Sequence, residues 1–143
     1  MAQGILQKKL AGAGLSGCSV TSMGIHGLDN SAASKNAVEV CDEQNIDISS
    51  HRSRQLVAEE LVNADLIFTM ELVHKEFLRL FFPRVEEKCV LLGSWPNKET
   101  RRGNIKDPIG GSKREYRKAF ENIDGHIERV FPLILEKIGG SGN

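Results

Sequence analysis

The chain is poor in cysteine, proline, tryptophan and tyrosine. It holds three cysteines, four prolines, one tryptophan and one tyrosine among 143 residues. Cys18, Cys41 and Cys89 are scattered and odd in number, and their spacing fits neither a disulfide framework nor a metal site. We therefore expect a reduced, cytoplasmic chain that requires no metal or other cofactor.

The chain also has no net charge and no long apolar run. Nineteen basic and nineteen acidic residues cancel, so we expect no surface for nucleic acid or membrane. No stretch approaches the roughly 20 apolar residues of a membrane span, and no secretory leader follows Met1. The length predicts one domain, which we assign to residues 1–138. Residues 139–143 (GGSGN) are expected to form a flexible tail.

Helical patterns alternate with short apolar runs of strand length. Helices are expected at 2–10, 31–45, 58–63, 71–82 and 113–138, the last after a capping box at Ser112 and Glu115. Strands are expected at 19–23 (SVTSM), 66–70 (LIFTM) and 89–92 (CVLL). This alternation predicts an α/β fold of three layers, with a mostly parallel sheet between helices. In the helix at 71–82 the expected inward residues are Leu72, Val73, Phe77, Leu80 and Phe81.

The chain opens on a helix, although a doubly wound fold normally opens on a strand. In such folds the loop after the first strand binds phosphate at the amino end of the next helix. Here no strand pattern precedes the helix at 2–10.

Several segments in this order carry a resemblance to a known family. They are 1–6 (MAQGIL), 20–24 (VTSMG), 46–56 (IDISSHRSRQL), 64–70 (ADLIFTM), 91–95 (LLGSW) and 107–112 (DPIGGS). Together they are similar to the low-molecular-weight protein tyrosine phosphatase family over essentially the whole chain. The resemblance implies the phosphotyrosine phosphatase I-like fold, with its first, central strand missing here.

The chemistry implied by the resemblance requires a C-x5-R-S loop after that first strand. A cysteine thiolate attacks phosphorus, and an arginine six positions later holds the phosphoryl oxygens. Six positions after the three cysteines stand Gly24, Asp47 and Trp95, so the loop is absent. We therefore expect the chain as it stands to be inactive. Two explanations stay open: an internal methionine codon taken as the start, or a truncated paralogue.

The resemblance carries three roles onto residues of this chain. Asp107 matches the general acid, which protonates the leaving oxygen. Ser22 and His51 match residues that brace the phosphate loop by hydrogen bonds. Without the resemblance, Asp107 would be a turn residue before proline, and Ser22 and His51 ordinary polar side chains. Arg52 and Arg54 are expected to be solvated or paired surface charges.

The implied substrates are phosphotyrosine proteins or small aryl phosphates. Ile109 and Gly110 stand where eukaryotic members have a pair of tyrosines, which weakens any strong selectivity for phosphotyrosine. Trp95 is expected to pack rather than to contact substrate. A non-enzymatic pseudophosphatase or self-associating binding module is the alternative function. Arsenate reduction is a weaker one, because the chain lacks a pair of resolving cysteines.

A missing central strand has a large energetic consequence. Burying about five apolar residues at roughly 1.5–3 kcal/mol each contributes about 8–15 kcal/mol. Losing this contribution would rival the whole free energy of unfolding of a typical domain, about 5–15 kcal/mol. It also leaves open edges on the strands at 19–23 and 66–70, and open edges recruit other strands. We expect either direct pairing of these strands or a homo-oligomer, by edge pairing or strand swapping.

Overall fold

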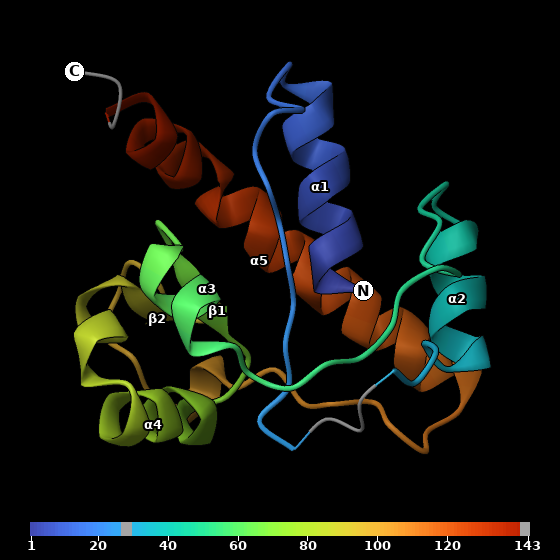
Figure 1. Ribbon diagram of the computed structural model, residues 1–143. Helices are drawn as coiled ribbons and strands as arrows, with labels where there is room; N and C mark the ends of the chain where they lie inside the picture. Colours follow the sequence, from blue (N-terminus) through green and yellow to red (C-terminus); the bar gives the residue numbers. More distant parts are fainter. Residues whose placement is uncertain (27–29, 141–143) are drawn as a thin grey trace.

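The computed structural model describes residues 1–26 and 30–140 (Figure 1). Its helices and strands, in chain order, are α1 (Ala2–Gly12), α2 (Lys35–Asp42), α3 (Ala58–Asn63), β1 (Ile67–Thr69), α4 (Leu72–Phe81), the 3-10 helix η1 (Pro83–Lys88), β2 (Cys89–Leu91), the 3-10 helix η2 (Arg101–Gly103) and α5 (Lys113–Gly140). Among the described residues, no helix combines the length and apolar character that crossing a membrane requires.

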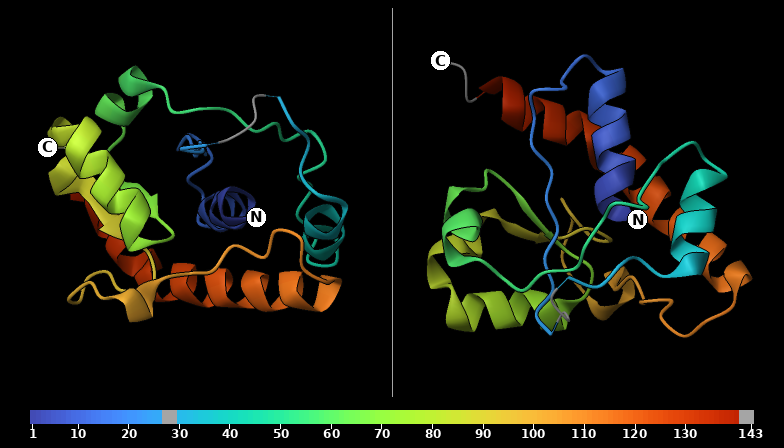
Figure 2. Two further views of the ribbon diagram at one scale, coloured as in Figure 1. Left: turned by 90° about the horizontal axis from the view of Figure 1, so that it is seen from below. Right: turned by 45° about the vertical axis from the view of Figure 1, so that its right-hand side comes forward.

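The sheet formed by the described residues consists of β1 and β2, which run parallel. Ile67, Phe68 and Thr69 lie opposite Cys89, Val90 and Leu91, and the Leu92 amide donates to the Thr69 carbonyl at 3.0 Å. Helix α4 packs against both strands, while α5 packs against α1 and α2 (Figure 2). The predicted α/β class with a parallel sheet flanked by helices is confirmed.

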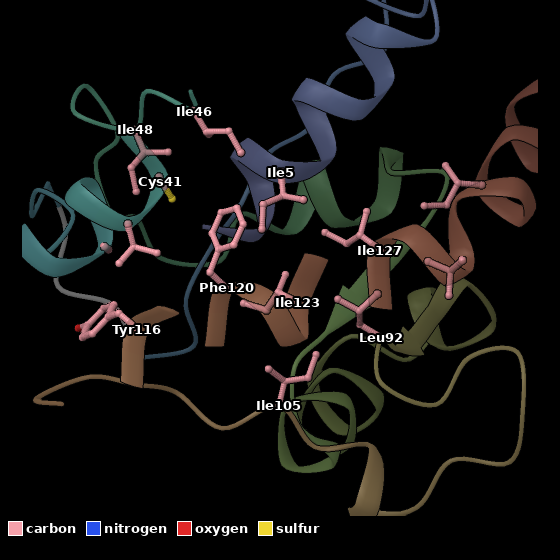
Figure 3. Close-up of a cluster of buried hydrophobic side chains, with 14 residues drawn as sticks. Ile5, Cys41, Ile46, Ile48, Leu92, Ile105, Tyr116, Phe120, Ile123 and Ile127 are labelled. Carbon is pink, nitrogen blue, oxygen red and sulfur yellow. The ribbon is translucent and has the colours of Figure 1, made fainter. Parts of the chain in front are cut away.

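Two clusters of buried side chains form the core. The larger one joins α1, α2 and α5 to the end of β2 (Figure 3). Its members from α5 are Tyr116, Phe120, Ile123, Ile127, Val130 and Ile134. The smaller one lies between α3, α4, η1 and β2, and consists of Leu61, Leu78, Val85 and Cys89. The long helix α5 therefore forms one side of the larger cluster, while the smaller cluster is built without it.

The capping box predicted for the last helix is present. The Glu115 amide donates to Ser112 Oγ at 3.4 Å, and Glu115 Oε2 accepts from the Ser112 amide at 2.7 Å. The helix continues through Gly139 and Gly140, so its predicted end at residue 138 is wrong. A helical glycine costs only about 1 kcal/mol relative to alanine, which is too little to end a well-packed helix. Residues 141–143 of the predicted tail lie outside the described residues.

Helix α2 is shorter than the predicted span of 31–45. It begins after Ser34, whose Oγ accepts from the Ala37 amide at 3.3 Å. It ends at Asp42, and Asn45 follows with a φ of 56°. The left-handed conformation suits asparagine and reverses the chain, which ends the helix. Ser34 and Asn45, rather than the apolar spacing, set the length of α2.

The strand predicted at 19–23 does not form. Its only bridge among the described residues is just beyond it, between Gly24 and Gln55. The Val20 carbonyl instead accepts from Gln7 Nε2 at 3.4 Å, and the Ser22 carbonyl from Arg54 Nε at 3.3 Å. The side chains of Gln7 and Arg54 thus bind carbonyls that a neighbouring strand would pair in a sheet. Direct pairing of 19–23 with β1, one of the two expected outcomes, is likewise absent, since β1 pairs only with β2 among the described strands.

The apolar face of α4 is only partly buried, contrary to the prediction. Leu78 is buried, whereas Val73, Leu80 and Phe81 are 64%, 60% and 66% exposed. The apolar stripe of this helix is wider than the surface offered by two three-residue strands and η1. The Phe77 and Phe81 rings contact each other, with centroids 4.6 Å apart.

Leu92 belongs to the larger core cluster and is 1% exposed, so a smaller side chain there should leave a cavity. We expect Leu92→Ala to lower the free energy of unfolding by about 2–5 kcal/mol, because it removes packed methyl groups and leaves a void. Leu80→Ala, at a residue 60% exposed, is the matched control and should change it far less. Urea denaturation measures both values. Equal losses for the two variants would contradict the assignment of Leu92 to the core.

Ion pairs join α2 to α5 at the surface. Lys113 Nζ lies 2.9 Å from both Glu39 Oε2 and Glu43 Oε1. Arg117 holds Glu43 in a bidentate pair, with Nε and Nη2 at 2.9 and 2.8 Å from its two oxygens. Hydrogen bonds from Arg117 and then Lys113 lower the pKa of Glu43 to about 2.

This network predicts a pH dependence of stability. Because the pKa of Glu43 is lower in the folded chain than its ordinary value of 4.5, its contribution is complete above pH 4.5. It is lost as the pH falls toward 2. The thermal unfolding midpoint of the unchanged chain should fall as the pH is lowered from 5 to 2. We expect this fall to be smaller in Glu43→Gln, because the substitution removes the carboxylate whose pKa is lowered by folding. Glu121→Gln, at an exposed residue of α5 outside this network, should leave the decline unchanged.

Candidate active site

The predicted general acid lies just past the carboxyl end of β1. The Ile105 amide donates to the Met70 carbonyl at 2.7 Å, and Asn104 Oδ1 accepts from the Leu72 amide at 2.9 Å. Residue 107 therefore follows a segment that is fixed to the chain leaving β1. In open parallel sheets, ligands bind outside the carboxyl ends of the strands. Asp107 thus stands at the edge of the sheet where chemistry is expected.

Close backbone packing also fixes the segment that leads to Asp107. A Cβ on Gly93 would lie 2.1 Å from the Gly103 carbonyl oxygen, so both positions exclude larger residues. Gly103 directly precedes the anchoring residues Asn104 and Ile105. The turn after β2 and the segment leading to Asp107 are therefore held against each other by backbone atoms.

The turn at Asp107 is formed by its own carboxylate. Oδ1 of the exposed Asp107 accepts from the Ile109 amide at 2.9 Å, an arrangement typical of Asx turns. Gly110 follows with a φ of 76°, and the Gly111 carbonyl accepts from Asn36 Nδ2 of α2 at 3.2 Å. The carboxylate is accessible to solvent at this edge.

Ser22 and His51 lie together around one polar cavity of about 370 Å³. The other residues that line it are Gln3, Thr21, Arg52, Arg54 and Glu60. Ser22 Oγ donates to Gln3 Oε1 on α1 at 2.6 Å. The structure therefore brings the two predicted bracing residues to one place, but Asp107 is not among the described residues that line this cavity.

The environment of His51 favours its neutral form. Burial lowers the pKa of His51, and the positive charges of the Met1 amino group, Arg52 and Arg54 lower it further. Because the ordinary value is 6.5, the imidazole is uncharged at neutral pH. A neutral histidine both donates and accepts hydrogen bonds, which suits a bracing role better than binding an anion.

The two arginines of the cavity are held by groups of this chain. Arg54 forms a bidentate pair with Glu60, with Nη1 and Nη2 at 2.5 and 2.6 Å from the carboxylate oxygens. Arg52 Nη1 donates to the carbonyls of Ser49 and His51 at 3.1 and 2.8 Å. The cavity is therefore no ready anion site, because Arg54 is paired with a carboxylate and Arg52 donates to main-chain carbonyls.

The cysteines supply no activated thiol. Cys41 and Cys89 are 0% and 2% exposed, and burial raises the pKa of both, for Cys89 to about 11. Both are therefore protonated at neutral pH, and the thiol is a poor nucleophile compared with the thiolate. Cys18 is partly exposed, but Gly24 stands where an arginine would be required.

Among the remaining candidates, Trp95 packs as predicted. Its ring makes an edge contact with Phe68, with centroids 5.9 Å apart, and it borders the larger core cluster. Ile109 is 79% exposed beside Asp107. Sequence reasoning missed Gln3 and Glu60, which partner Ser22 and Arg54, because no local pattern signals contacts between distant segments. No group of three or more metal-ligating side chains exists among the described residues.

Comparison with known proteins agrees with this arrangement. Residues 1–139 match the family described as low molecular weight phosphotyrosine protein phosphatase. The low molecular weight protein-tyrosine-phosphatase Etp of Escherichia coli K12 is 34% identical over 116 residues, which cover 81% of this chain and 73% of Etp. A protein-arginine-phosphatase of Geobacillus stearothermophilus is 32% identical over 130 residues, covering 91% and 83%.

A solved structure shows the same fold. The low molecular weight protein tyrosine phosphatase from T. tengcongensis superimposes with a TM-score of 0.84 at 31% identity, covering 92% of this chain and 87% of that one. The family match spans nearly the whole chain, and the same chain carries the segment around Asp107 at the carboxyl end of β1. The chain therefore belongs to the low molecular weight protein tyrosine phosphatase family.

Proposed function

We propose that this chain carries the general-acid part of a cysteine-dependent phosphomonoesterase and does not hydrolyse phosphate esters on its own. The observation that carries the proposal is the state of its thiols. No cysteine is followed six positions later by arginine, and Cys41 and Cys89 are buried and protonated. Asp107, by contrast, is exposed at the edge of the sheet where a substrate would bind.

The family chemistry divides the reaction between two groups. The thiolate attacks phosphorus, forming an S–P bond while the P–O bond to the leaving group breaks. Asp107 would donate its proton to that oxygen and then take a proton from the water that cleaves the S–P bond. Without the thiolate neither step begins, so the acid alone gives no turnover.

Ser22 and His51 would act through the phosphate loop rather than on substrate. Both face the polar cavity beside α1, and the neutral imidazole of His51 both donates and accepts hydrogen bonds. We infer that they are positioning residues for a loop placed next to α1. In the described residues, Ser22 bonds to Gln3 instead.

Phosphotyrosine proteins or small aryl phosphates are the substrate class we propose for the complete site. The aliphatic, exposed Ile109 beside Asp107 offers no aromatic wall for a tyrosine ring. Because one relative is named a protein-arginine-phosphatase, phosphoarginine is the second substrate to test. We place the protein in the cytoplasm, since its three cysteines are free thiols.

The alternative function is a non-enzymatic one, as a pseudophosphatase that binds a partner. The observation that favours it is that Arg54 is paired with Glu60 and Arg52 donates to main-chain carbonyls, which leaves no preformed phosphate site there. In that case the segment around Asp107 would have a structural role only.

Hydrolysis of para-nitrophenyl phosphate tests the proposal. The 143-residue chain is compared with a chain extended at its amino end by the residues encoded upstream. We expect no turnover by the former and turnover by the latter. In the extended chain, Asp107→Asn should lower kcat by about 10²–10⁴-fold, because it removes the proton donor.

Asp65→Asn, at an exposed aspartate before the amino end of β1, is the matched control and should keep full activity. Turnover by the unextended chain would show that another nucleophile exists and would overturn the proposal. An inactive extended chain would favour the binding function.

A further inference from the structure

Positive charge is concentrated in one segment of this chain, although the chain as a whole is neutral. Residues 98–118 hold eight basic and three acidic residues, so the segment has a surplus of five positive charges. The rest of the chain carries an equal negative surplus. The segment runs from just before η2, through Asp107, into the start of α5, along one side of the molecule (Figure 2). The charge of this surface therefore differs from the average that the composition gives.

Most of the basic side chains in this segment have no partner in the chain. Lys113 and Arg117 are the exceptions, since both pair with Glu43 of α2. The other six are exposed, and none forms an ion pair or a side-chain hydrogen bond with any described residue. We call these six residues the basic strip. They are Lys98, Arg101, Arg102, Lys106, Arg114 and Lys118.

The three acidic residues of the segment form no ion pair with the basic strip, because other groups hold them. Glu99 pairs with Lys75 of α4 at 2.6 Å. Glu115 Oε2 accepts from the Ser112 amide at 2.7 Å, within the capping box of α5. Asp107 Oδ1 accepts from a main-chain amide of its own turn. The strip therefore presents its positive charge to solvent.

Asp107 lies between the two parts of the basic strip. Four members precede it in the chain and two follow it. Hydrogen bonds from Ser112 lower the pKa of Glu115, and the charges of Lys106 and Lys118, one from each part, lower it further. Both parts thus come near the start of α5. Positive charge accompanies the predicted acid on both sides, where the residues before and after a bound phosphorylated residue would lie.

We propose that the basic strip binds acidic residues that flank the phosphorylated residue of a protein substrate. The inference rests on the proposed function, because it takes Asp107 as the group that faces the leaving oxygen. Opposite charge speeds the encounter with such a substrate and helps to fix its orientation. An extended acidic peptide suits a strip that continues on both sides of the acid better than a compact anion does.

The same charges would attract nucleic acid or an anionic membrane, but the segment lacks other features that these ligands use. Single-stranded nucleic acids stack their bases on exposed aromatic rings. Tyr116, the one aromatic residue of 98–118, is only 6% exposed. Binding in a membrane interface requires an apolar face, whereas Ile109 is the one large apolar side chain exposed in this segment. An acidic peptide is therefore the ligand that the segment fits best.

Fluorescence anisotropy of a labelled peptide tests the basic strip without any need for turnover. The probe is phosphotyrosine with about three glutamates on each side, and the same peptide with glutamines in their place is its control. We expect the 143-residue chain to bind the glutamate peptide at least about tenfold more tightly at low salt. This difference should largely disappear at about 0.5 M NaCl, because salt screens exposed charges.

Charge reversals locate the binding surface. We expect Arg102→Glu and Lys118→Glu, one on each side of Asp107, each to weaken binding of the glutamate peptide by about fivefold, because attraction becomes repulsion. Arg84→Glu is the matched control. Arg84 and Arg102 are both exposed arginines of 3-10 helices, so the net charge changes equally. The control lies outside the strip and should weaken binding by less than about twofold.

Kinetics of the extended chain separate this inference from the proposed function. There Arg102→Glu should raise KM for the glutamate phosphopeptide by about fivefold and leave kcat unchanged, because it removes binding that substrate and transition state share. Its KM for para-nitrophenyl phosphate, which has no flanking residues, should stay the same. An inactive extended chain would contradict the proposed function, while the anisotropy measurements would still decide whether the strip binds acidic peptides.

Three results would overturn the proposal. Equal affinity for the glutamate and glutamine peptides would show that the strip does not recognise acidic residues. An equal loss in Arg84→Glu would show that only net charge matters. Tighter binding of polyuridine or of phosphatidylserine vesicles than of the glutamate peptide, abolished by Arg102→Glu, would assign the strip to nucleic acid or membrane instead.

Discussion

The packing of α5 against α1, α2 and the end of β2 is the interaction on which the larger core depends. Two strands of three residues each cannot support a layer of helices, because a sheet this small buries little apolar area. Helix α5 instead offers an apolar stripe of six buried residues that contacts α1, α2 and the end of β2 (Figure 3). Arg129 of the same helix donates to the Leu92 carbonyl at 2.9 Å, which fixes the helix to the sheet.

The same helix fixes one end of the segment that carries Asp107, the predicted general acid. The segment around Asp107 ends at Ser112, the N-cap of α5, and begins at Ile105, which bonds to the chain leaving β1. Both ends are therefore fixed by the core. Between them, the Asx turn of Asp107 and the contact of Gly111 with Asn36 define the path. The position of the carboxylate thus depends on packing and turn geometry.

Sequence patterns predict the parts of this fold that are decided locally. The apolar runs at 66–70 and 89–92 gave strands, and the capping box gave the start of α5, because short-range spacing determines them. The strand predicted at 19–23 is wrong because a strand exists only beside a partner strand. The predicted burial of the apolar face of α4 is wrong because periodicity does not say how much surface is available to cover that face. The meeting of Ser22 with His51 rested on the family resemblance, and the partner Gln3 had no local signal.

The surroundings of the two buried cysteines, Cys41 and Cys89, differ from those that a nucleophilic thiolate requires. A reactive thiolate needs a partly exposed, electropositive site. Near Cys89, Lys75 lowers the thiol pKa, but burial raises it more, and Glu99 opposes the effect of Lys75. Lys75 and Glu99 pair at 2.6 Å, so their charges largely cancel at the sulfur. Burial in this core therefore keeps the Cys89 thiol protonated at neutral pH.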